Sequence, residues 1–295
     1  MPDRRNRRPD ALSSIFVETS QSKYAALRIG ELMEQGWEED YCLGLLLLGD
    51  NRAGKTRLVR HYVDTTLDEC HQNKAVPPIV RVEVPPGCSL RSFPTAVLRA
   101  LKDPDPSYGN LSDRTGRIAE AAERHNVQLL VFDEVQRLID ADTEKVKENV
   151  AIWVSGLLNH RVCPVLLVGE PKAKWVFVGN KHLEGRTMGQ VDITSFDWAD
   201  EKQRYEFASV LHQIDTQLGM AELSDLGRLR TAQRIHEFAE GLLGQAARLI
   251  GHARVIARRL NRPKLTYDIF EQAVNELRVG EGRGLPNPFR SDQAG

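Results

Sequence analysis

The residue types best suited to chemistry stand together in one short loop, GDNRAGKT, at residues 49–56. The loop fits the pattern G-x-x-x-x-G-K-S/T and comes directly after the apolar run YCLGLLLL. Glycines at both ends let the backbone turn its N–H groups toward phosphate oxygens. Lys55 can reach the β- and γ-phosphates, and the Thr56 hydroxyl can hold Mg²⁺. We therefore predict a nucleotide site formed by Gly49, Asp50, Asn51, Arg52, Ala53, Gly54, Lys55, Thr56 and Arg57.

A second candidate site is an acidic pair at the end of another apolar run, LLVFDEV. Asp133 is predicted to hold the Mg²⁺ ion through water, and Glu134 to polarise the water that attacks the γ-phosphate. A pair that is merely solvated is the alternative, and the phosphate loop upstream argues against it. Adjacent Asp and Glu favour ATP hydrolysis to ADP and phosphate over phosphoryl transfer to a small acceptor.

Two arginines are candidates for contacts with the nucleotide phosphates. Arg186 precedes a short β-like run and could reach the γ-phosphate of a neighbouring subunit. Arg248 lies one turn into a helix that we expect to begin after Gly244, where it could report on bound nucleotide. For each, the alternative is an exposed arginine with no catalytic use.

The elements that must position these residues alternate between strands and helices. Apolar runs predict strands at 42–49, 78–84, 127–135 and 163–171, and helical periodicity is found at 24–36, 56–70, 90–101, 113–125 and 144–160. Such alternation predicts an α/β fold, a parallel sheet with helices on both faces. From about residue 200 only helix-like segments follow. The expected organisation is a disordered basic N-terminus (1–14), an α/β nucleotide-binding domain (15–199), an all-α lid (200–279) and a flexible C-terminal tail (280–295).

Composition limits the possible functions. Hydrophobic residues make up 41% of the 295 residues, which suits an ordinary buried core, and the formal net charge is -1. Nucleic-acid contact must therefore come from a local arrangement of charge. No apolar run approaches the length that spans a bilayer. The four cysteines are widely spaced, so we expect free thiols in a soluble cytoplasmic protein without a membrane partner.

The order of the motifs resembles the TniB and TnsC family of AAA+ regulators of DNA transposition. The pieces GDNRAGKTRLV, NVQLLVFDEVQRL and PVLLVGEPKA are the most similar, and the resemblance extends over most of residues 15–275. It implies a P-loop AAA+ ATPase that uses ATP and Mg²⁺ and assembles on double-stranded DNA as rings or filaments. It also implies slow, assembly-coupled hydrolysis and partnership with a transposase and a target-selector protein.

The resemblance also assigns roles to single residues. The ligand and lytic roles of the family fall on Lys55, Thr56, Asp133 and Glu134, and those of its arginines on Arg186 and Arg248. One position departs from the family. Where members carry Thr or a small polar residue after the third apolar strand, this chain has Glu170. A carboxylate beside a triphosphate is electrostatically unfavourable, so Glu170 either faces away or marks an unusual site.

DNA contacts are the least visible feature of the sequence. The candidates lie near the ATP motifs: Arg91, Arg114, Arg117, Lys145 and Lys147. Solvated helix faces are the alternative for each of them. The basic RRNRR and the segment GLPNPFR near the two ends could serve recruitment or be plain disorder.

Two other functions stay open. The first is a helicase loader or another protein-remodelling AAA+ switch. The second is a nucleotide-gated adaptor that barely hydrolyses ATP, for which Glu170 gives slight support.

Overall fold

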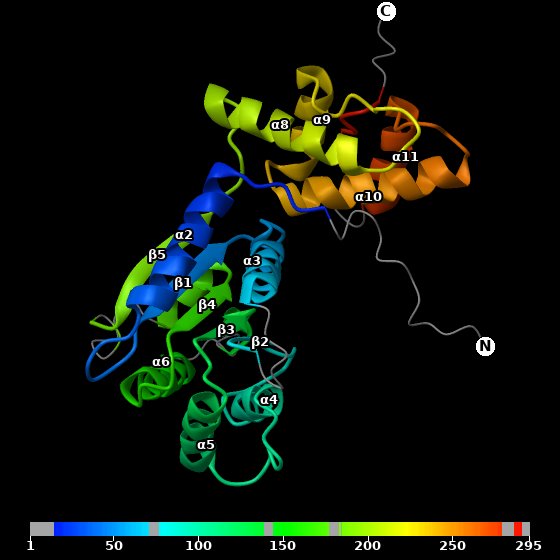
Figure 1. Cartoon of the computed structure of the whole chain (residues 1–295). Helices are drawn as coiled ribbons and strands as arrows, with labels where there is room; N and C mark the ends of the chain where they lie inside the picture. Colours follow the sequence, from blue (N-terminus) through cyan, green and yellow to red (C-terminus); the bar gives the residue numbers. More distant parts are fainter. Residues whose placement is uncertain are drawn as a thin grey trace, which may run out of the picture. The chain divides into compact units, whose positions relative to one another are not determined.

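A computed structural model describes residues 15–70, 77–138, 144–176, 183, 185–278 and 286–290. The chain folds as two compact units (Figure 1). The sheet unit comprises Ser20–Asn51 and Lys55–Ile193. The helical unit comprises the other described residues: 15–19, Arg52–Gly54 and the chain from Thr194 onward. The division thus falls after Ile193, earlier than the predicted boundary at residue 199.

The sheet unit is built on five parallel strands in the order β2-β3-β4-β1-β5. The strands are β1 (Gly44–Gly49), β2 (Ile79–Glu83), β3 (Leu129–Asp133), β4 (Val165–Gly169) and β5 (Thr187–Ile193). Every residue of β1, β3 and β4 is buried, as strands covered on both faces require. Because the strands are parallel, their carboxyl ends lie along one edge. The phosphate loop, the acidic pair and Glu170 all follow strand ends at this edge.

Helices cover both faces of the sheet. They are α2 (Ser20–Gln35), α3 (Lys55–Cys70), α4 (Phe93–Ala100), α5 (Leu111–Arg124) and α6 (Glu144–Asn159), with the 3₁₀ helices η2 (Val135–Leu138) and η3 (Pro171–Val176). Alternate strand residues such as Leu130 and Phe132 share one core cluster with α4, α5 and α6. Helices α2 and α3, which contact β1 outside this cluster, lie on the other face. The structure thus confirms the predicted parallel sheet with helices on both faces.

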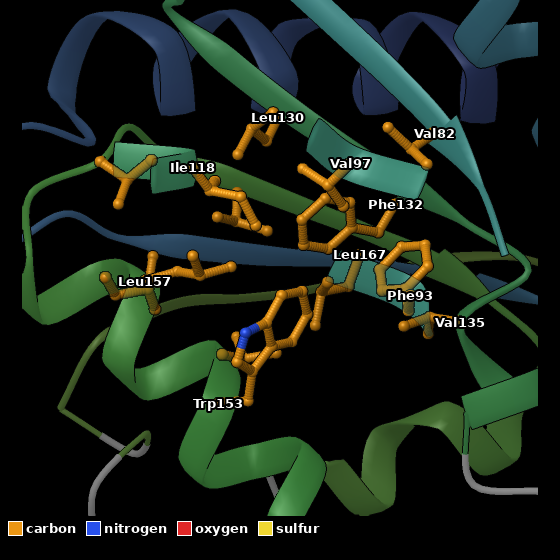
Figure 2. Packing of buried hydrophobic residues seen from close by; sticks show 14 of the residues in the cluster. Val82, Phe93, Val97, Ile118, Leu130, Phe132, Val135, Trp153, Leu157 and Leu167 are labelled. Carbon is orange, nitrogen blue, oxygen red and sulfur yellow. The ribbon is translucent and has the colours of Figure 1, made fainter. Parts of the chain in front are cut away.

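Aromatic packing holds α4 and α6 on the sheet. Figure 2 shows Phe93 of α4, Phe132 of β3 and Trp153 of α6 in one cluster. The Phe93 and Phe132 rings meet edge to face at 5.1 Å, and Phe132 stacks on Trp153 at 5.7 Å. The Trp153 Nε1 donates to the Thr115 hydroxyl at 3.1 Å, which ties α6 to α5. The cluster therefore fixes β3, and with it the acidic pair at its end.

The helical unit contains α8 (Glu201–Gln217), α9 (Leu229–Ala239), α10 (Leu243–Arg259) and α11 (Tyr267–Leu277). Its core includes Phe207, Ile235 and Phe270. Part of the predicted tail belongs to this core. Phe289 is 1% exposed and stacks on Phe270 with ring centroids 4.7 Å apart. Among the described residues, none of the helices combines the length and apolarity that crossing a bilayer requires.

Candidate nucleotide site

The phosphate loop joins β1 to α3 as the motif requires. Gly49 ends β1 and Lys55 begins α3. A Cβ on Gly49 would lie 2.4 Å from the carbonyl oxygen of Ile193, so only glycine allows β1 to approach the end of β5 this closely. Gly54 has φ +104°, a conformation that side chains disfavour. Both motif glycines therefore have a geometric reason to be present.

Lys55 points back toward the loop that precedes it. Its Nζ donates to the carbonyl oxygens of Gly49 at 2.7 Å and Asp50 at 2.8 Å, and the residue is 6% exposed. Burial lowers the pKa of Lys55, while the negative charges of Glu134 and Asp133 oppose this shift. Asp133 at the end of β3 and Glu134 directly after it thus act electrostatically on the ammonium.

Asp133 is 1% exposed, and both of its carboxylate oxygens are engaged. Oδ2 accepts a hydrogen bond from Arg81 Nη2 at 2.5 Å, and Oδ1 accepts from the Glu134 backbone N–H at 2.9 Å. Arg81 belongs to β2, which pairs with β3. Its guanidinium supplies positive charge at the carboxylate predicted to face Mg²⁺.

The Asp133 carboxylate and the Thr56 hydroxyl in the first turn of α3 are the predicted oxygen donors for a metal. Among the described residues, no group of three or more His, Cys, Asp or Glu side chains could hold a metal ion alone. Magnesium in nucleotide sites takes one or two protein oxygens, with the remaining ligands from phosphates and water. Thr56 and Asp133 therefore fit Mg²⁺ that arrives with a nucleotide.

Glu134 adopts a strained backbone with φ 60°, which is uncommon outside glycine and clusters at functional sites. Its carboxylate is held from two sides. Oε2 accepts from Gln136 Nε2 at 2.8 Å and lies 3.5 Å from Arg137 Nη2. Arg137 is itself anchored, because its Nη1 donates to Glu83 Oε1 at 3.0 Å and to the Val84 carbonyl at 2.5 Å.

Gln136 links the ends of β3 and β4. While its Nε2 binds Glu134, its Oε1 accepts from the Glu170 backbone N–H at 3.2 Å, and the side chain is buried. A Cβ on Gly169 would lie 2.8 Å from this Oε1. The glycine at the end of β4 therefore leaves room for the Gln136 amide.

Glu170 belongs to the same group of charges. Its negative charge also opposes the lowering of the Lys55 pKa, after the larger contributions of Glu134 and Asp133. Its carboxylate lies 3.7 Å from Lys172 Nζ in an ion pair. Lys172 offsets part of the unfavourable charge that a carboxylate would present to a triphosphate.

Arg186 lies at the other end of the sheet. Its carbonyl oxygen accepts from the Gly44 N–H at 2.8 Å, where β1 begins, and its guanidinium lies 5.1 Å from the centre of the Tyr41 ring. The length of β1 separates this position from Gly49, about 16 Å at 3.3 Å per residue. That distance exceeds the reach of one side chain, so Arg186 cannot serve the phosphate loop of its own chain.

Residues 52–54 of the loop are grouped with the helical unit. There the Arg52 carbonyl oxygen accepts from the Gly244 N–H at 2.9 Å, and Arg52 Nη1 donates to Gln245 Oε1 at 2.5 Å. Arg248 is exposed, on the same helix, α10, which begins at Leu243. Desolvation and then the charge of Arg52 lower the pKa of Arg248.

The remaining loop residues differ in exposure. Asp50 and Asn51 are exposed, and Ala53 is buried. Arg57 is half-buried in the first turn of α3, and burial lowers its pKa.

Two of the candidate DNA-contact residues bind a loop of their own chain. Arg114 donates to the carbonyl oxygens of Arg91 at 2.7 Å and Ser107 at 2.9 Å. Arg117 pairs with Asp103 and donates to the carbonyl oxygens at 105 and 108. Both guanidinium groups thus brace residues 101–110 between α4 and α5. Arg91 and Lys145 are exposed, and the side chain of Lys147 lies outside the described residues.

Sequence reasoning missed Arg81, Gln136 and Arg137. The signal for Arg81 was a charged residue inside the apolar run PIVRVEV, where a buried arginine needs a carboxylate partner. The signal for the other two was their place directly after the acidic pair in VFDEVQRL. Nothing in the sequence indicated that Gln136 reaches β4.

Comparison with known proteins adds to this geometry. The family model described as "Bacterial TniB protein" matches residues 12–189, more than half of the chain. No protein with a curated description matches it. Among solved structures, Cdc6p from Pyrobaculum aerophilum is similar over 95% of this chain and 75% of its own, with 14% identity and a TM-score of 0.66.

Two further solved structures are similar. The Aeropyrum pernix ORC1 protein in complex with DNA matches over 91% of this chain and 68% of its own, with 14% identity and a TM-score of 0.65. The Thermotoga maritima RuvB Holliday junction branch migration motor matches over 94% of this chain and 75% of its own, with 16% identity and a TM-score of 0.52. At these identities the similarity shows a shared fold.

Proposed function

The chain belongs to the family of bacterial TniB proteins, AAA+ ATPases of DNA transposition, and from this premise we propose that it assembles on double-stranded target DNA in its ATP-bound state and recruits or activates a transposase. The observation that carries the proposal is the buried Lys55, which lies under the electrostatic influence of Asp133 and Glu134. A lysine for phosphates and an acidic pair for metal and water are the parts that ATP hydrolysis needs.

Lys55 binds the nucleotide in this mechanism. Its ammonium is already desolvated and bonded to two loop carbonyl oxygens, at Gly49 and Asp50. A bound triphosphate offers charged oxygens in their place, and charge-assisted hydrogen bonds are the stronger ones. Mg²⁺ held by Thr56 and Asp133 would neutralise phosphate charge and orient the γ-phosphate.

Glu134 is the proposed base that polarises the attacking water. Its side chain is 28% exposed, so water has access to the carboxylate. Gln136 and Arg137 hold its Oε2, which limits the orientations of the carboxylate and leaves Oε1 to accept a proton.

Arg186 is the residue from which we infer an oligomer. Since it cannot reach the loop of its own chain, a role in hydrolysis requires the γ-phosphate of a neighbouring subunit. Stacking over Tyr41 restricts the guanidinium, which lowers the entropy lost on forming such a contact. ATP rather than ADP would then favour assembly.

DNA binding is a further part of the proposal. The ORC1 structure with the same fold contains DNA, and exposed cations such as Arg91 and Lys145 can face a phosphate backbone. At a net charge of -1, a single subunit should bind weakly. An assembly would align the same few cations many times along one duplex, so affinity should rise steeply with duplex length and fall with salt.

One set of measurements tests the proposal. Glu134→Gln should bind ATP with unchanged affinity, release phosphate far more slowly, and form rings or filaments on long duplex DNA in electron micrographs. Lys55→Ala should lose nucleotide affinity and assembly together. Glu123→Gln, the same exchange at an exposed residue of α5, is the control and should match the unmodified protein.

The outcomes separate the alternatives. Normal hydrolysis by Glu134→Gln would refute its role as the base. Hydrolysis and assembly without DNA binding, at any salt or duplex length, would favour the protein-remodelling switch. Nucleotide binding without measurable hydrolysis in the unmodified protein would favour the nucleotide-gated adaptor.

A further inference from the structure

A large groove opens on the face of the sheet unit that carries α4, α5 and α6. Its volume is about 1060 Å³, and it lies between residues 87–91, α5 and α6. The volume slightly exceeds the roughly 300–1,000 Å³ of ligand pockets, which leaves room for a peptide segment. The lining is mainly apolar, with Leu111, Leu138, Ile152 and Trp153. Ile152 is 52% exposed, an apolar side chain left open at the rim.

Two glycines inside helices line this groove. Gly116 lies within α5 and Gly156 within α6. Glycine destabilises helix interiors relative to alanine, so such positions usually have a packing reason. Here there is none, because a Cβ on either glycine would meet no atom within 4 Å. The two helices keep space open where an alanine would be more stable.

The charged lining residues are all basic. Arg91 and Arg137 line the groove together with His160, and no described lining residue is a carboxylate. An occupant should therefore bring negative charge. The basic segment RRNRR near the start of this chain is excluded by the same argument, because like charges would repel it.

We propose that this groove binds a short acidic segment of a partner protein, with a large apolar side chain inserted between Gly116 and Gly156. The apolar anchor covers Ile152 and packs on Trp153. Carboxylates on either side of the anchor pair with Arg91 and Arg137. A guanidinium has five N–H donors in a fork that suits a carboxylate, so Arg137 can accept an additional partner beside Glu83.

Arg137 connects the groove to the nucleotide site. It lines the groove, and its Nη2 lies 3.5 Å from the Glu134 carboxylate. A carboxylate bound in the groove competes for this guanidinium and weakens its hold on Glu134. Because Gln136 and Arg137 together limit the orientations of the Glu134 carboxylate, occupancy should lower the rate of ATP hydrolysis. This last step rests on the proposed role of Glu134, whereas binding to the groove does not.

The test is selection from a display library of randomised dodecapeptides on the full chain without nucleotide. Selected peptides should carry Asp or Glu around an aromatic or aliphatic residue. Their affinity, measured by fluorescence anisotropy, should fall about tenfold or more when Gly116→Leu and Gly156→Leu fill the groove. Glu120→Leu, an exposed change on α5 outside the lining, should leave binding unchanged.

Folding is monitored with two further variants. Gly116→Ala and Gly156→Ala should each raise Tm by about 2–4 °C, since both remove a helix glycine from open space. Should the leucine variants fail to fold, Ile152→Glu replaces them, because it changes an exposed side chain and repels an acidic peptide.

The result that overturns the proposal is a selection in which no peptide depends on the groove, or in which the groove-dependent peptides are basic. Peptides that bind the filled and unfilled proteins equally count against it as well. Groove-dependent acidic peptides that bind without altering hydrolysis would keep the docking site and refute the link through Arg137. If the unmodified protein does not hydrolyse ATP, the proposed function is refuted, whereas the binding result is unaffected.

Discussion

Replacing Gln136 by methionine removes the side-chain link between Glu134 and the end of β4 while keeping the length of the side chain. Two hydrogen bonds are lost: 2.8 Å to the Glu134 carboxylate and 3.2 Å from the Glu170 N–H. A bond to a charged group contributes about 1.5–3 kcal/mol and a neutral one about 1 kcal/mol. The free energy of unfolding should thus fall by about 2–4 kcal/mol.

A second effect is expected on turnover. Of the contacts that the described residues make with the Glu134 carboxylate, the ion pair with Arg137 would remain, so the carboxylate would take more orientations. We expect kcat to fall on the order of tenfold, because small displacements of a base are costly. KM for ATP should be unchanged, since Lys55 donates to the carbonyl oxygens of Gly49 and Asp50, which the substitution leaves in place. Phosphate release at saturating ATP measures the first quantity, and a titration with ATP measures the second.

Gly169→Ala disturbs the same contact of Gln136 by steric overlap. Its Cβ would lie 2.8 Å from Gln136 Oε1 and 3.0 Å from the Ala173 Cβ, so the Gln136 amide must move. The alanine variant should lower kcat as Gln136→Met does, and the double variant should be no worse than the more severe single change. Gln128→Met, at an exposed glutamine before β3, is the control.

Two results would refute this reasoning. One is an unchanged kcat in a Gln136→Met protein with the expected loss of stability, which would make Gln136 purely structural. The other is a raised KM with normal kcat, which would place the residue in nucleotide binding.

Three other predictions concern different parts of the sheet unit. Arg186→Ala subunits should restore hydrolysis when mixed with Glu134→Gln subunits, and no rescue in confirmed mixed assemblies would argue against a contact between subunits. Arg114→Ala combined with Arg117→Ala should lower the unfolding free energy in urea by about 2–4 kcal/mol and leave the salt dependence of DNA binding unchanged. Burial raises the pKa of Cys42 from 9.0 to about 11, so the stability present below pH 9 is lost as the pH rises through 11. In Cys42→Ala, the free energy of unfolding in urea should fall less between pH 9 and 11, by up to about 2–3 kcal/mol, than in the unmodified protein. The same dependence on pH in both proteins would contradict the assignment.

The central strands β1, β3 and β4 could be predicted from sequence because they are buried on both faces. Runs such as LLLL in β1 have no polar face, and the turn signals after them mark the strand ends. The phosphate loop and the acidic pair were predictable for a related reason. Each motif is contiguous, and parallel strands bring their carboxyl ends to one edge whatever the strand order.

What the sequence did not reveal depends on pairs far apart in the chain. The contact of Arg81 with Asp133 exists because β2 pairs with β3, and that order is not encoded in either strand alone. The brace formed by Arg114 and Arg117 depends on the path of the loop before α5. Exposed and loop-binding arginines have the same local sequence pattern, which is why both were candidates for DNA contact.

The packing of Phe289 has a practical consequence for shortening the protein. Residues 280–295 are rich in glycine and proline, and such terminal segments are often removed before purification or crystallisation. Cutting before residue 286 would take away the ring that stacks on Phe270 and meets the Tyr267 ring at 5.8 Å. The uncovered aromatic surface would promote aggregation, which could then be mistaken for regulated assembly. Truncations that keep residues 286–290 would avoid that error.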